Sequence, residues 1–309
     1  MRHFLLLLIL TLLACCGRHS KPEPLAVDAD LAARVNQKVS TYESLLLAHQ
    51  DQHGFIMTSH CDATLFSGLL GAAMPGTVDL LAARGPDNRF YRRPLGTYPE
   101  CYESGSSKST ISRDMFIGIL WHLWVNRMSE DVRLLMTNAR NNDYIMGSGD
   151  PSRISLMPNL TKLLAEMDYR LNGRDSDERY LPTIWTKGLV DYEAHLQVWQ
   201  ILLYGEVFGF IDGFQKARLL EHYERRPDNP LYAAAWARWI SGNWNPALAA
   251  LDNPRWPADR LPTSRDYSTD WWIQRDDPSD LLPDLEGPER QHTGAEIVVI
   301  YNLIIRGHL

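Results

Sequence analysis

The sequence predicts an all-α domain, and three observations support this prediction. Apolar residues recur at the three-to-four-residue spacing of a helix through most of the chain. Strand and helix patterns do not alternate, which excludes the doubly wound and barrel α/β classes. With 45% hydrophobic and 22% charged residues among 309, the composition is that of a chain able to bury a large core.

The helical segments follow one another along the chain. The first is marked by apolar side chains at helical spacing: Leu31, Val35, Val39, Tyr42, Leu46 and Leu47. Later ones cover residues 62–83, 111–127, 129–145, 155–172, 189–209, 212–226 and 230–241. Ser112 and Ser129 occupy expected N-cap positions. The run 297–305 is rich in β-branched residues, but a lone strand would have no partner, so we interpret it as a buried helix that begins near Thr293.

Two of these helices are apolar nearly all round, which predicts that they lie in the interior. The first has a polar stripe at four-residue spacing: Asp114, Gly118, His122 and Asn126. The second has two stripes, one of Asp191, His195 and Glu206 and one of Glu193, Gln197, Gln200 and Tyr204. Because buried polar groups require partners, we expect these stripes to face polar groups or a water-filled cavity.

The amino terminus has the features of an export signal. Arg2 precedes an apolar run of ten residues, 4–13, which is too short to span a bilayer. The stretch Leu12-Leu13-Ala14-Cys15 that follows resembles the lipobox of bacterial lipoproteins. This resemblance implies a signal peptide over 1–14, acylation of Cys15 and a tether over 15–27. The residue after the acylated cysteine would be Cys16 and not Asp, which resembles the Gram-negative lipoproteins that are placed by default in the outer membrane. An ordinary secretory signal remains the alternative.

The export signal bears on the remaining cysteines. The bacterial periplasm is oxidising, so Cys61 and Cys101, forty residues apart, are a plausible disulfide. Two buried free thiols are the alternative, because spacing alone does not establish a disulfide.

Three long irregular segments, 84–110, 173–188 and 252–291, interrupt the helices, and loops of this length are usually functional or disordered. Helical hairpins, interior helices with polar ends and long aromatic loops on one rim resemble the (α/α) toroids of six-hairpin glycosidases and related polysaccharide lyases. The resemblance implies a single domain over 28–309, arranged as a complete or incomplete toroid. It assigns no residues.

Several other functions are disfavoured by composition and motifs. The formal net charge of −7 argues against a nucleic-acid partner. The stretch 105–110 fails as a phosphate-binding loop because Ser107 stands where glycine is required before Lys108. No serine-nucleophile motif is found. The cluster His49, Asp51, His53, His60 and Asp62 could bind a metal but lacks a defined ligand spacing, so we expect neither metal nor cofactor.

Paired carboxylates are the strongest catalytic candidates, because glycosidic cleavage needs one protonated acid and one ionised carboxylate. Asp114, in a first helical turn beside Arg113, suits the ionised base. Asp270 suits the acid, since Trp271 and Trp272 could desolvate it. Each has a purely structural alternative, as part of a helix start or of an ordinary loop.

Further residues are expected to bind the substrate or to assist. His195, four residues after Asp191, could donate a hydrogen bond or a proton. The remaining substrate-binding candidates are Arg113, Asp62, Asp266, Trp271, Trp272, Arg275 and His292.

The sequence therefore predicts a lipid-anchored envelope protein, at the outer membrane and facing the periplasm, that cleaves or binds a glycan or another cell-envelope polymer. The membrane is contacted only through the anchor. The alternative is a non-enzymatic helical scaffold or binding lipoprotein, whose polar stripes would be hydrogen-bonded to one another.

Overall fold

The structure is a computed structural model that describes residues 20–48, 50–55, 63–94, 110–147, 154–189, 191–253 and 295–308. Over these residues it is mostly helical, which confirms the predicted all-α class. The helices are α2 (Ala29–Ala48), α3 (Ala63–Ala73), α5 (Met115–Val125), α6 (Ser129–Asn141), α7 (Pro158–Asn172), α8 (Asp191–Phe208), α9 (Gly213–Arg225), α10 (Pro230–Trp236), α11 (Asn245–Asp252) and α12 (Ala295–Val299).

Shorter elements complete the described chain. Single 3₁₀ turns are η1 (Leu80–Ala83), η2 (Asp177–Tyr180) and η9 (Arg306–His308). Two helices continue into π turns, α10 into η3 (Ala237–Ser241) and α12 into η8 (Ile300–Ile305). Strands β1 (Ile145–Gly147) and β2 (Ile154–Ser155) form an antiparallel pair between α6 and α7. Among the helices described, none combines the length and the apolar character needed to cross a bilayer.

Several predicted boundaries need correction. The segment predicted to be helical over 62–83 divides into α3 and η1, because Met74, Pro75 and Gly76 form a turn and Gly76 has a φ of 85°. The predicted helix over 297–305 is confirmed, whereas α11 was not predicted. Residue Ser112 is not the N-cap of α5; Asp114 occupies that position, and Ser112 donates its hydroxyl hydrogen bond to the Asp114 carboxylate. Ser129 is likewise the first residue of α6, not its cap.

Helices α3 and α5 pack with their backbones in contact. A Cβ at Gly118 would lie 2.1 Å from the carbonyl oxygen of Leu65, and one at Gly68 would lie 2.5 Å from the Gly118 backbone. Glycine at these two positions therefore permits the close approach. One turn further on, Gly71 faces His122, so the two helices run in the same direction.

Six helices point the same way and form a closed series of contacts. Each packs on the next in the order α3, α5, α7, α8, α10, with η8 and α12 packing in turn on α10 and α3. Hydrogen bonds join their carboxyl-terminal ends: Asn126 to the Gly71 carbonyl, Arg170 to the Phe208 carbonyl, Arg238 to Glu206 and Arg238 to the Ile304 carbonyl. We call the two ends of this series the carboxyl-end face and the amino-end face.

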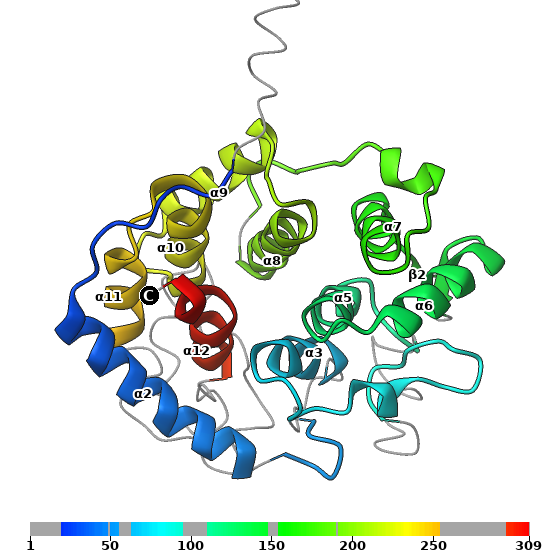
Figure 1. Cartoon of the computed structure of the whole chain (residues 1–309), viewed down its shortest axis with the longest axis horizontal. Helices are drawn as coiled ribbons and strands as arrows, with labels where there is room; N and C mark the ends of the chain where they lie inside the picture. The colour runs from blue at the N-terminus through cyan, green and yellow to red at the C-terminus, as the bar shows by residue number, and fades with distance from the viewer. Residues whose placement is uncertain are drawn as a thin grey trace, which may run out of the picture.

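The remaining helices lie around this series. Figure 1 shows α3, α5, α8 and α12 toward the middle of the molecule, with α2, α11 and α6 outside them. The core is continuous through these helices and includes three nearly inaccessible tryptophans, Trp121, Trp199 and Trp239. These three side chains therefore serve packing.

Candidate functional site

Of the two predicted catalytic carboxylates, Asp114 lies in the described part of the chain, at the amino-end face. Asp114 precedes the first residue of α5, is partly exposed, and accepts a hydrogen bond from the Ser112 hydroxyl. Its neighbour Arg113 is exposed. A carboxylate at a helix amino terminus interacts favourably with the helix dipole, and an accessible one can serve as a base.

Beneath this face lies a buried polar cluster formed by His195, Gln197, His222, Tyr232 and Glu296. These side chains come from the second turn of α8, the first turns of α10 and α12, and α9, and each is at most 6% exposed. The predicted candidate His195 is therefore brought together with groups that are distant in the sequence. At 1% exposure its ring does not reach solvent, so it acts on its neighbours and not directly on a ligand.

His195 has a carboxylate on one side and a hydroxyl on the other. Its Nε2 lies 3.6 Å from Glu296 Oε1, a charge contact that is longer than a hydrogen bond, and its Nδ1 lies 3.3 Å from the Tyr232 hydroxyl. With the proton on Nε2, Nδ1 accepts from Tyr232. The carboxylate, imidazole and hydroxyl thus lie in the order of a general-base triad, although only the contact between His195 and Tyr232 is within hydrogen-bond distance.

His222 has a defined tautomer. Arg225 Nη2 lies 3.1 Å from His222 Nδ1, and because a guanidinium can only donate, Nδ1 must accept. The proton is then on Nε2, which donates over 3.0 Å to Gln197 Oε1, while Gln197 Nε2 donates to the Thr186 carbonyl. The cluster thus links α8 and α9 to the segment before α8 through neutral, directional hydrogen bonds.

The predicted stripe of Asp191, His195 and Glu206 is not one site. Glu206 lies at the carboxyl-end face, where it binds Arg238 over 2.6 Å and Lys21 over 3.0 Å. Burial lowers the pKa of Lys21, although the nearby Glu206 opposes this shift. The Asp191 side chain lies outside the described part of the structure.

The predicted stripe on α5 faces α3. His122 packs against Gly71, and Asn126 donates to the Gly71 carbonyl over 3.2 Å. Burial lowers the pKa of His122 from 6.5 to about 4, so this imidazole is neutral at physiological pH. The sequence left two environments open for this stripe, polar groups of the protein or a water-filled cavity. His122 and Asn126 face protein groups of α3.

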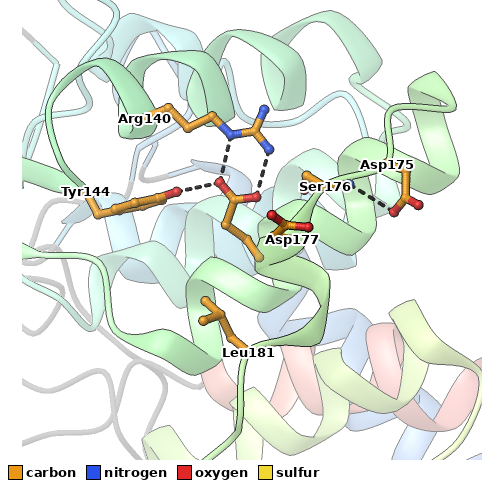
Figure 2. A pocket seen from close by; sticks show the side chains of 7 residues that line it. Arg140, Tyr144, Asp175, Ser176, Asp177 and Leu181 are labelled. Atoms are coloured by element: carbon orange, nitrogen blue, oxygen red, sulfur yellow. Dashed lines mark hydrogen bonds and ion pairs between the residues drawn. The ribbon is translucent and has the colours of Figure 1, made fainter.

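Two of the surface hollows among the described residues are well defined, and neither contains a predicted site residue. One of about 390 Å³ lies at the carboxyl-end face between α3, α5, α8 and η8, with Trp121, Trp124, Arg127 and Glu206 in its lining. The other, of about 620 Å³, lies against the outer helix α6 and is shown in Figure 2.

The hollow in Figure 2 is organised by one carboxylate. Arg140 donates two hydrogen bonds to Glu178, over 2.8 and 3.0 Å, and the Tyr144 hydroxyl donates a third. These hydrogen bonds lower the pKa of Glu178 from 4.5 to about 2, and those from Arg140 are the main cause. Asp175 and Asp177 border the same hollow. The arrangement ties the segment after α7 to α6.

Most of the predicted site lies outside the described residues. These predictions are the lipidated Cys15, the disulfide pair Cys61 and Cys101, and the candidates Asp62, Asp266, Asp270, Trp271, Trp272, Arg275 and His292. His49, His60 and Asp62 of the possible metal cluster are also outside. Within the described ranges, no group of three histidine, cysteine or acidic side chains is arranged to hold a metal ion.

Sequence reasoning missed Tyr232 and Glu296 as the neighbours of His195, and His222 as the partner of Gln197. A weak signal existed for one of them, since Glu296 is the only charged residue of the run 295–305. An acid in such a setting requires a buried partner.

Comparison of the chain with protein-family models, with curated proteins and with solved structures found no match.

Proposed function

We propose that the domain is an (α/α) toroid whose inner ring consists of α3, α5, α7, α8, α10 and α12. The closed series of contacts among these parallel helices supports this arrangement. Helices α2, α6, α9 and α11 would belong to the outer ring, each followed in the chain by an inner helix. The amino-end and carboxyl-end faces are then the two openings of the ring.

We propose that the protein is an envelope lipoprotein that binds or cleaves a glycan at the amino-end face. The carrying observation is that this face combines the partly exposed Asp114 with the buried cluster around His195. Two other candidates are close in the sequence to helices that begin at this face. Asp62 directly precedes α3, and His292 lies shortly before α12.

In the proposed chemistry, Asp114 is the ionised base and Asp270 the acid that protonates the leaving oxygen. Arg113, exposed beside Asp114, would position the substrate together with Asp266, Trp271, Trp272, Arg275 and His292. His195 is a positioning residue, held between Glu296 and Tyr232 beneath the face. No metal or cofactor is invoked.

The test uses soluble protein beginning after Cys16, incubated with cell-envelope and plant polysaccharides while new reducing or unsaturated chain ends are measured. Replacing Asp114 by Asn should lower the rate by about 100-fold or more and leave glycan binding nearly unchanged. Asp143→Asn is the matched control, because Asp143 is an exposed aspartate at φ 51°, a conformation that asparagine tolerates. Equal rates for the two variants would refute the role of Asp114.

A non-enzymatic binding lipoprotein is the second candidate, and one observation favours it. Some polar side chains of the interior helix α8 are satisfied within the protein, as in the link from His222 through Gln197 to the Thr186 carbonyl. A scaffold needs nothing more from them. Glycan binding without any new chain ends, unchanged by Asp114→Asn, would establish this candidate in place of the enzyme.

A further inference from the structure

The chain enters the folded body at the carboxyl-end face. Lys21 reaches Glu206 in the last turn of α8, and the Leu25 amide donates to the carbonyl of Gly242, the residue after η3. In Figure 1 the dark-blue segment before α2 runs across the view from α2 to α9. Residues 21–26 therefore cross the ends of α8 and η3.

This segment is held in place by several contacts. Glu206 binds both Lys21 and Arg238, and the Lys21 ammonium lies 5.3 Å from the Trp239 ring. The Glu23 carbonyl packs so closely on Gly242 that a Cβ there would lie 2.1 Å from it. The position of entry is thus fixed by the folded body.

The distance from this entry point to the proposed lipid is short. Six residues separate Lys21 from Cys15 in the sequence, so even a fully extended chain spans only about 20 Å. A body joined to a membrane by so short a connection, at a fixed point on one face, cannot turn its opposite face to the lipid.

The surface around the entry point suits a lipid headgroup region. Phe214, at the start of α9, is 67% exposed, and Leu25 is 55% exposed. The exposed Arg127 lies over the ring of Trp124 at 4.6 Å, beside the smaller hollow. Aromatic and arginine side chains of this kind are frequent at membrane interfaces.

The face is not strongly basic. Exposed cations such as Arg127 and Arg306 are accompanied by the exposed acids Glu23 and Glu130. The exposed Arg170 and Arg174 at the end of α7 are paired with Glu166 and Asp168. Attraction to anionic lipid is therefore not the organising force, and contact should depend on the tether and on apolar side chains.

We propose that the carboxyl-end face is apposed to the membrane surface, with Phe214 and Leu25 in the headgroup region, and that the amino-end face points away from the membrane. This inference rests on the proposed acylation of Cys15 and not on the proposed glycan chemistry. It implies that the amino-end site meets polymers on the side remote from the membrane.

Hydrogen exchange measured by mass spectrometry tests the orientation. The acylated full-length protein on phosphatidylethanolamine–phosphatidylglycerol vesicles is compared with the soluble chain that begins after Cys16. Amides of 22–27 and 209–214 should exchange at least about threefold more slowly on vesicles, and those around Ile184 should not change. This slowing should persist at high salt, because it does not depend on surface charge.

Stronger slowing around Ile184 than around Phe214, or equal slowing at both ends, would overturn the orientation. Phe214→Ser should abolish most of the slowing over 209–214, whereas the matched Ile184→Ser, at a side chain also 67% exposed but near the amino-end face, should not. Intact mass showing no acyl chain on Cys15 would overturn both anchoring and orientation. A failed glycan assay would leave this result standing.

Discussion

Gly68 of α3 and Gly118 of α5 meet backbone to backbone. A Cβ at Gly118 would lie 2.1 Å from the Leu65 carbonyl oxygen, which is a rigid group that cannot move aside as a side-chain tip could. The contact sets the separation of the two helices and therefore the position at which Asp114 is held, one turn before Gly118.

Replacing Gly118 by alanine should accordingly force α3 and α5 apart. We expect the free energy of unfolding to fall by about 3 kcal/mol or more, measured by urea denaturation. Gly307→Ala is the control, since a Cβ there meets no atom within 4 Å, and it should leave stability nearly unchanged. Equal stability of the two variants would show that the helices separate freely.

The hydrogen bonds between Arg140 and Glu178 predict an acid-sensitive contribution to stability. The pKa of Glu178 lies at about 2 in the folded chain and near 4.5 when unfolded, so the unfolded chain binds the proton first as pH falls. The contribution is complete above about pH 4.5 and is lost as pH decreases toward about 2. Glu178→Gln should be less stable by about 1 to 3 kcal/mol at pH 7, with a smaller loss at pH 2.5.

The comparison for Glu178 is Glu130→Gln, whose carboxylate pairs with Arg133 at the surface and is 63% exposed. Surface pairs contribute little, so its midpoint of thermal unfolding should hardly change at either pH. A Glu178→Gln protein as stable as the parent at pH 7 would show that the segment after α7 needs no ionic contact.

Local sequence patterns predicted the helices well, because the spacing of apolar residues within a helix shows which of its sides are buried. The spacing of apolar residues in 111–127 is sufficient to indicate an interior helix, and α5 is buried along its length from Met115 to Trp124. The end of α3 was missed because the run of apolar residues continues to Ala83, although the Pro75-Gly76 turn interrupts it.

The partners of polar residues could not be predicted in the same way. His195 and Glu206 are eleven residues apart on α8, yet the first contacts α10 and α12 while the second contacts the amino-terminal segment. Which helix covers a given stripe depends on tertiary packing, and the contacts between distant helices cannot be read from a single sequence. For the same reason the His122 stripe, facing two glycines of α3, could not be distinguished from a wet cavity.

His122 predicts a second pH effect, at higher pH than that of Glu178. Burial lowers its pKa to about 4, below the value of 6.5 expected when unfolded, and the nearby Asp79 and Asp131 only partly oppose this shift. The unfolded chain therefore binds the proton first, so stability should decrease as pH falls from about 6.5 to about 4. In His122→Gln this part of the pH dependence should disappear.

The variant is judged by the difference between its unfolding free energy and that of the parent, followed by urea denaturation at several pH values. Gln200→Met provides the comparison, because Gln200 is a half-buried residue and the substitution removes no titratable group. Its difference from the parent should stay flat across the same interval. If His122→Gln also gives a flat difference, His122 does not lose a proton on folding.

The tautomer assigned to His222 predicts the cost of removing its acceptor. Gln197→Met keeps a side chain of similar length but leaves the His222 Nε2 hydrogen and the Thr186 carbonyl without their Gln197 partner. We expect a loss of about 1 to 3 kcal/mol in the free energy of unfolding, because a buried donor without an acceptor keeps its full desolvation penalty. Gln200→Met, at a half-buried position on the same helix, should lose much less. Nuclear magnetic resonance of the imidazole nitrogens supplies the independent check: a proton on Nδ1 of His222 in the parent protein would contradict the assigned direction of the whole hydrogen-bond chain.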